Sequence, residues 1–287
     1  MSAIPTSATS ATPATSNASA IQAPRVRPPP TFFQKHRALV LGSTSVIVML
    51  VLWELIWQSG KISPLFFSGP SAVAARFVHE LKNGNLLSDI AYSGRNFLVG
   101  FSLACLVAIP LGILLGWYRN FRLLVDPFLN AFYATPRISF IPLIIIWFGI
   151  GMWSKVFIVF LAVLFPVLIN TIAGVKNLDP DLLKSARAFC ALDRQIFMTI
   201  ALPSSVPFIL AGVRQGVAHG LIGVIVGELF AGNEGIGFMI AYAGQTFATD
   251  LLLCGVLITA TAGMVITMIA DRIQRHFSKW RPNDVGG

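Results

Sequence analysis

Six apolar runs, each about as long as a helix that crosses a lipid bilayer, recur along this 287-residue chain. A transmembrane helix needs about 20 mostly apolar residues, and a helix satisfies its backbone polar groups internally where no water can. The runs lie at about 39–57, 96–117, 125–150, 153–173, 205–228 and 251–270. The sequence therefore predicts an all-α, polytopic membrane protein with six transmembrane helices.

The composition agrees with a chain whose main solvent is lipid. Hydrophobic residues make up 55% of the chain and charged residues 11%, which leaves too little polar surface for a soluble domain of this length. The three cysteines, Cys105, Cys190 and Cys254, form no CxxC motif and no cluster with histidine. We therefore expect neither a metal site nor a framework of disulfides.

Residues 1–30 differ in composition from the rest of the chain. The first twenty are mainly Ser, Thr, Ala and Pro, with no charged residue. Such a segment buries too little apolar surface to offset its ordering entropy, so we expect 1–30 to be a disordered cytoplasmic tail. Residues 31–282 are expected to form the transmembrane domain. No basic head precedes an apolar core, so we expect no secretory signal peptide.

The loops between the runs predict the orientation. With the N-terminus inside, the cytoplasmic segments hold 14 Lys and Arg residues and the external segments hold 5. Cytoplasmic loops carry the excess of basic residues, so both termini are expected in the cytoplasm. The formal charge of +9 is then mostly loop charge, and we expect no nucleic-acid partner. In the external loop 58–95, Val73, Phe77 and Leu81 predict a short helix on the outer membrane surface.

The loop between the fourth and fifth runs is amphipathic. Asp179 suits a helix N-cap, and Pro180 suits the first helical position. An apolar face then recurs at helical spacing, formed by Leu182, Ala186 and Phe189. The periodicity alone leaves two interpretations open. Either this helix lies on the membrane surface, or its apolar face enters a groove on a partner protein.

A turn and a second helix are expected to follow. Cys190 and Ala191 mark the turn, Asp193 is the expected cap of the second helix, and Pro203 is its expected end. If the turn needs a positive φ, Cys190 is strained where glycine would not be. The residues that this helix brings to one face are Ile196, Phe197 and Ile200.

The stretch KSARAFCALDRQIFMTIALP, Lys184–Pro203, resembles the EAA loop of permease subunits of ABC importers. That pattern is Glu-Ala-Ala, three residues, Gly, nine residues, and then Ile-x-Leu-Pro. Ala186 occupies the second Ala position, and the pattern is closed in register by Ile200, Leu202 and Pro203. The departures are Lys184 at the Glu position, Ser185 at the first Ala position and Cys190 at the Gly position.

The resemblance extends over nearly everything after the tail. Pro142–Thr171 is similar to the third and fourth spans of nitrate/sulfonate/taurine-type permeases, and Gly212–Ile240 is similar to their fifth span and the Gly-rich turn after it. The resemblance implies an ABC importer permease of the bacterial inner membrane, which passes a small anion such as a sulfonate, taurine or nitrate. It implies ATPase contact by Leu182, Lys184, Ser185, Ala186, Arg187, Phe189, Cys190, Ile200, Leu202 and Pro203.

The same resemblance implies a set of partners. A second permease copy, expected as a homodimer, would complete a central pathway in the bilayer. A separate ABC ATPase subunit would hold ATP and Mg, and a periplasmic binding protein would deliver the substrate. This chain would then carry no catalytic residue and bind no cofactor or metal of its own.

Ionisable residues at membrane depth are candidates for the translocation pathway, because burying charge in lipid is costly. The candidates are Arg137, Arg214 and Glu228. Two positive groups would suit an anionic substrate, although an ion pair between spans would cancel that argument. For Glu54 and for His219 we expect structural roles instead.

Two other functional classes can be compared with the permease. An ion-coupled secondary transporter often uses carboxylates in the middle of its spans, and these are nearly absent here. A membrane-embedded enzyme needs His, Asp, Glu or Cys clustered at one depth, and no such cluster is visible. The sequence therefore favours the permease and keeps the secondary transporter as the alternative.

Overall fold

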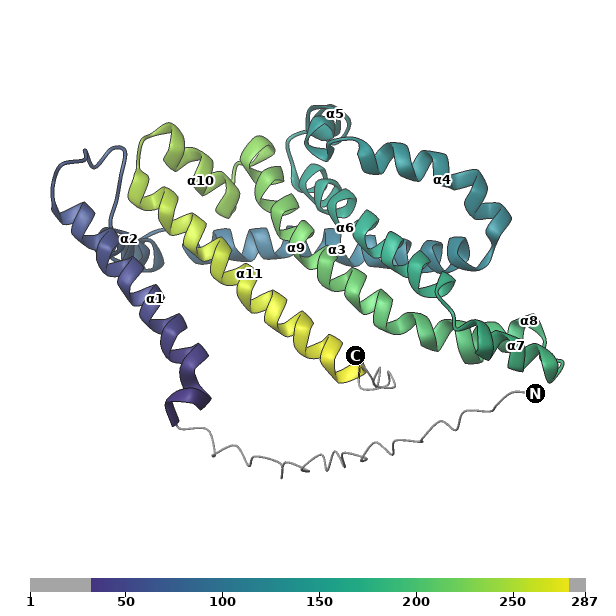
Figure 1. The fold of residues 1–287 in the computed structure, drawn as a ribbon. Helices are drawn as coiled ribbons and strands as arrows, with labels where there is room; N and C mark the ends of the chain where they lie inside the picture. Colours follow the sequence, from purple (N-terminus) through teal and green to yellow (C-terminus); the bar gives the residue numbers. More distant parts are fainter. Residues whose placement is uncertain (1–31, 279–287) are drawn as a thin grey trace, which may run out of the picture. The chain divides into compact units, whose positions relative to one another are not determined.

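A computed structural model describes residues 32–278, and within this range every regular element is a helix (Figure 1). The all-α class is thereby confirmed. The expected tail, residues 1–30, lies outside the described residues. The contacts divide the chain at Met49, so that helix α1 (Phe32–Gln58) begins in one unit and ends in the other. The second unit starts at Leu50 and contains the helices that pack together.

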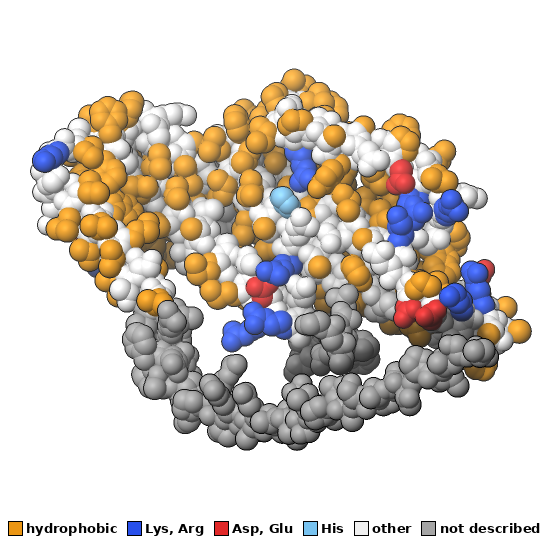
Figure 2. Space-filling model, viewed as in Figure 1, with side chains coloured by type: hydrophobic (Ala, Val, Ile, Leu, Met, Phe, Trp, Pro, Cys, Tyr) orange, Lys and Arg blue, Asp and Glu red, His pale blue; other side chains and the backbone are white. Residues whose placement is uncertain are grey.

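Five helices of the described chain are long and apolar enough to cross a membrane. They are α1, α3 (Leu86–Trp117), α6 (Met152–Lys176), the continuous helix 193–231 that ends in α9 (Leu202–Ala231), and α11 (Thr249–Ser278). Apolar side chains cover most of the face seen in Figure 2, and charged ones gather there beside α4 and over the segment that joins α6 to α9. These features place the protein in a membrane.

The third predicted run, 125–150, is a bent pair of helices and not one continuous helix. The pair consists of α4 (Arg119–Ala134) and the segment 137–148, bent by 92°. That segment is a 3₁₀ turn, η1 (Arg137–Phe140), followed by α5 (Ile141–Phe148). The cause is local. Thr135 precedes Pro136, and a residue before proline is disfavoured in the helical region. Both residues have extended backbone, which interrupts the helix.

Helix α6 packs against both α3 and α9 and carries much of the core (Figure 1). Small residues allow this close approach, as is common between membrane helices. A β-carbon at Gly220 of α9 would lie 2.8 Å from the Val163 side chain of α6, and one at Gly100 of α3 would lie 2.7 Å from Val159. The fully buried apolar side chains at this junction include Ala104, Val159, Val163 and Val167.

Two shorter helices precede α3 and follow α9. Helix α2 (Pro70–Asn83) confirms the helix expected in the loop 58–95. Glu54 of α1 holds its start, since the carboxylate accepts hydrogen bonds from the Ser71 amide at 3.0 Å and the Ser71 hydroxyl at 2.7 Å. This is the structural role expected for Glu54. Helix α10 (Ile236–Gln245) lies between α9 and α11 and contacts both.

Candidate functional site

Helix α7 (Pro180–Ala188) begins as the sequence predicts. The Asp179 carboxylate accepts a hydrogen bond from the Asp181 amide at 2.8 Å, and Pro180 occupies the first helical position. No residue of α7 is buried; Leu182 on the helix is 51% exposed, and Phe189, the C-cap that directly follows it, is 88% exposed. An amphipathic helix with its apolar side chains exposed provides a surface for a partner.

The turn after α7 has the strained backbone that a glycine would relieve. Cys190 has a φ of 54°. Its amide donates to the Arg187 carbonyl at 2.9 Å, and the Ala191 amide donates to the Ala186 carbonyl at 3.0 Å. These two hydrogen bonds form a Schellman motif, in which the residue with positive φ is usually glycine. A β-carbon there costs about 1–2 kcal/mol.

We expect Cys190→Gly to stabilise this turn by roughly 0.5–1 kcal/mol, because the gain from removing the β-carbon exceeds the backbone entropy that glycine loses. Amide hydrogen exchange at Cys190 and Ala191, whose two bonds close the turn, should slow accordingly. Cys190→Ala is the matched control, since it removes the thiol and keeps the β-carbon. Equal slowing in both variants would show that the backbone is not the cause.

The second helix departs from two expectations. Helix α8 (Asp193–Ile196) starts at Asp193, so this residue is the first helical residue and not the cap; the cap is Leu192, whose amide donates to Gln195 Oε1 at 2.8 Å. Pro203 does not end the helix. The chain continues through a π-helical segment, η2 (Phe197–Ala201), into α9. Pro203 comes directly after Leu202, the C-cap of η2, whose amide donates to the Phe197 carbonyl five residues earlier, so the proline stands at the junction of the π-helical segment with α9.

The residues of the predicted ATPase contact fall into two groups. The first group lies on α7 and its turn and is Leu182, Lys184, Ser185, Ala186, Arg187, Phe189 and Cys190. The second group, Ile200, Leu202 and Pro203, lies where the loop joins α9. The Lys184 ammonium pairs with Asp181 of the same helix at 3.1 Å, with both side chains more than three-quarters exposed. The Phe197 ring packs on Trp117 of α3, with the ring centroids 5.0 Å apart.

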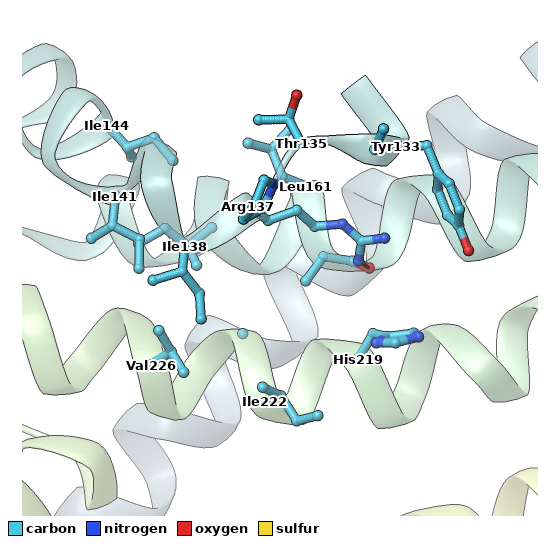
Figure 3. A pocket seen from close by; sticks show the side chains of 15 residues that line it. Tyr133, Thr135, Arg137, Ile138, Ile141, Ile144, Leu161, His219, Ile222 and Val226 are labelled. Atoms are coloured by element: carbon cyan, nitrogen blue, oxygen red, sulfur yellow. Dashed lines mark hydrogen bonds between the residues drawn. The ribbon is translucent and has the colours of Figure 1, made fainter. Parts of the chain in front are cut away.

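Arg137 lies at the bend of the third span and lines a pocket of about 340 Å³ (Figure 3). Its Nη1 donates to the Ala162 carbonyl at 3.2 Å, and its guanidinium carbon lies 5.6 Å from the Phe165 ring centre and 5.9 Å from that of Tyr133. Such cation–π contacts stabilise a partly desolvated charge. His219 lines the same pocket from α9. The sequence did not indicate that these two residues share a site.

Neither of the other two pathway candidates lines this pocket. Arg214 of α9 forms an ion pair with Asp271 of α11 through its Nε atom, which is the kind of pairing that cancels the argument for a free charge. Glu228 is fully buried. Its carboxylate accepts hydrogen bonds from Ser93 Oγ at 2.7 Å, Asn96 Nδ2 at 3.1 Å and the Gly237 amide at 3.0 Å. Of the three candidates, the geometry brings only Arg137 to the pocket.

Lys155 is a buried residue whose place the sequence did not reveal. It stands at the start of the fourth run and was counted among the external residues, yet its side chain is fully buried and Nζ donates to the Tyr92 hydroxyl at 2.8 Å. A β-carbon on Gly227, the neighbour of Glu228, would lie 3.5 Å from the Lys155 Cα, so Lys155 of α6 faces this stretch of α9. A signal was available: a lone carboxylate in an apolar run needs a partner, and Glu228 was such a carboxylate.

Comparison with known proteins gives consistent results. Residues 108–281 match the family model described as "Binding-protein-dependent transport system inner membrane component". The taurine transport system permease protein TauC of Escherichia coli is 30% identical over 85% of this chain and 90% of its own. A putative aliphatic sulfonates transport permease protein, SsuC of Bacillus subtilis, is 29% identical over 86% and 90%. A chain of the inward-facing MetNI methionine ABC transporter shares the fold with a TM-score of 0.58 at 18% identity, covering 67% of this chain and 95% of that chain.

Proposed function

Because this chain belongs to the family of binding-protein-dependent transport system inner membrane components, we propose that α7 and its turn dock this ABC importer permease onto a separate ATPase subunit. The chain is a permease subunit and not an enzyme. ATP and Mg are bound by the ATPase partner in this proposal. The alternative of an ion-coupled secondary transporter has no support from the comparisons.

One observation carries the docking proposal: large apolar side chains are exposed on α7 and at its C-cap, and no residue of α7 is buried. Leu182 of the helix is 51% exposed, and Phe189 at the cap is 88% exposed. A groove on the ATPase would remove both side chains from water, which is the helix-in-groove mode of recognition. Lys184 is already paired within α7, so its contribution to docking is small, as for most exposed ion pairs.

The loop also has a route by which motion of the ATPase can reach the spans. α8, η2 and α9 form one continuous helix, and Phe197 of this helix packs on Trp117 of α3. A displacement of α7 is therefore passed to two spans at once. In this mechanism ATP and the substrate-loaded binding protein each favour one of two arrangements of the spans.

The remaining partners complete the transporter. A second copy of this chain pairs with the first around the pathway, and a periplasmic binding protein delivers the substrate to the outer face. The substrate in this proposal is a small anion, such as a sulfonate, taurine or nitrate. Two lines support it: relatives are named for taurine and for aliphatic sulfonates, and an arginine lines the pocket at the span bend.

Cysteine labelling tests the orientation and the docking surface together. Cys190 is exposed, Cys254 is buried and Cys105 is partly buried, so Cys190 is the most accessible of the three thiols. We expect a membrane-impermeant maleimide to label Cys190 only after the cells are permeabilised. In a Cys190→Ser background, Asn85→Cys should be labelled on intact cells. Addition of the ATPase subunit should protect Cys190.

Two outcomes would contradict this account. Labelling of Cys190 on intact cells would reverse the orientation. Full labelling of Cys190 in an assembled, ATP-hydrolysing complex would remove the docking surface from α7 and its turn.

A further inference from the structure

We propose that the pocket at the bend of the third span binds an organic monoanion with an apolar body, held by the guanidinium of Arg137. This inference rests on the proposed function and narrows its substrate class. It distinguishes such anions from a zwitterion such as taurine and from a small inorganic anion such as nitrate. Three features of the pocket carry it: an unpaired positive charge, an apolar lining without carboxylates, and an interrupted backbone at membrane depth.

The charge of Arg137 has no acidic partner among residues 32–278. The ion pairs formed there use other cations, and Arg137 makes its contacts with the Ala162 carbonyl and two aromatic rings. A guanidinium carries five N–H donors, so several remain for a ligand. An anion would complete the site with charge-assisted hydrogen bonds, which guanidinium groups make in pairs to planar or trigonal oxygen anions.

The rest of the lining selects the body of the ligand. Aliphatic side chains from the bend, α6 and α9 make up most of the remaining lining, among them Ile138, Ile141, Ile158, Leu161, Ile222 and Val226. Figure 3 shows the guanidinium extending from the bend toward Tyr133. No Asp or Glu lines the pocket, so the ammonium of a zwitterion would lose its water without gaining a counter-charge. The pocket has a volume of about 340 Å³, which is at the lower end for small-molecule sites. Nitrate is too small to fill this volume, so water would remain against much of the apolar lining.

The backbone gives an independent indication that this place is a cavity for a polar group. The regular helix stops at Thr135 and Pro136, whose backbone is extended, and α5 resumes it after η1. Non-helical backbone at membrane depth is tolerated where it is buried in protein or lines a water-filled cavity. Thr135 and Pro136 both line the pocket. His219, from the opposite wall, supplies at least one N–H donor in either protonation state.

The test measures ligand binding to the full-length permease alone in lipid nanodiscs, through the rise in its thermal denaturation midpoint. The probes are hexanesulfonate, taurine and nitrate, with empty nanodiscs to account for partitioning into lipid. We expect a saturable rise with hexanesulfonate and none with taurine or nitrate over the same concentrations. Arg137→Gln should weaken hexanesulfonate binding by about tenfold or more, and Arg137→Lys by less.

Arg95→Gln is the matched control, because it removes one exposed arginine from α3 that does not line the pocket. It should leave hexanesulfonate binding unchanged. Equal binding to wild type and Arg137→Gln, or binding of taurine as tight as that of hexanesulfonate, would overturn the proposal. Because no ATPase is present, these outcomes are independent of docking at α7. Loss of Cys190 protection would instead contradict the proposed function and leave the pocket result intact.

Discussion

Glu228→Leu is expected to lower the stability of the folded permease by about 3–5 kcal/mol, because each buried donor left without an acceptor costs about 1–3 kcal/mol. The leucine cannot accept the hydrogen bonds that Ser93, Asn96 and the Gly237 amide donate to the carboxylate. It also removes a negative charge from the part of the core in which Lys155 is buried, where Nζ donates to the Tyr92 hydroxyl. Both effects act in the same direction.

The damage should spread to the start of α10. The amides of its N-cap and of its first two residues are bonded to side chains of α3 and α9: Gly235 to Asp89 at 2.9 Å, Ile236 to Ser93 at 2.9 Å, and Gly237 to Glu228. Gly235 has a φ of 102°, and a β-carbon there would lie 2.5 Å from the Glu228 carboxylate, so the turn is built closely around that group. Loss of the carboxylate therefore loosens the whole connection between α9 and α10.

The denaturation midpoint of the purified protein checks this prediction. A fall of about 10 °C corresponds to the expected loss for a chain of this size. Glu234→Gln is the control, since it removes an exposed carboxylate six residues away and should change little. The double variant Lys155→Met, Glu228→Leu should recover part of the loss, because it removes the stranded charge. A midpoint like that of wild type for Glu228→Leu would show that the buried carboxylate contributes little to stability.

Features set by local sequence could be predicted. The length of the apolar runs predicts the spans, since bilayer thickness depends on no tertiary detail. The Asp179–Pro180 pair predicts the start of α7, because capping involves neighbouring residues only. The sequence also predicts that Cys190 is strained if its turn needs a positive φ, because this φ depends on only a few neighbouring residues. The structure has that positive φ.

Features set by contacts between distant segments could not be predicted. Lys155 stands near the start of the fourth apolar run, and only the packing of α6 on α3 brings it to Tyr92, 63 residues earlier in the chain. Arg214 and Arg137 look alike in sequence, yet Asp271 neutralises the first and the second faces a pocket. The bend at Thr135–Pro136 did have a local cause. It was missed because proline is often tolerated inside membrane helices.

Ala186→Glu is expected to abolish docking of the ATPase subunit. Ala186 is partly buried on α7. It belongs to the predicted apolar face and lies between Leu182 and Phe189 in the chain. A glutamate there suits the helix, so α7 should still form. In the complex, however, its charge would enter an apolar contact without a partner, at a cost of several kcal/mol. A loss of that size weakens association by more than about a hundredfold.

Asn177→Glu is the matched control for this change. It adds the same charge to the same loop at an exposed position outside α7. Both variants should insert in the membrane and pair with a second copy as the wild type does, because neither position lies in a span. Only the variant in α7 should lose the ATPase and, with it, ATP-driven uptake.

Retention of the ATPase subunit on affinity-tagged permease, measured beside ATP-driven uptake in the same membranes, tests the docking claim most directly. Wild type and Asn177→Glu should retain the ATPase and drive uptake, whereas Ala186→Glu should retain none and transport nothing while remaining folded in the membrane. An Ala186→Glu permease that holds its ATPase and transports at the wild-type rate would contradict the assignment of α7 as the docking helix.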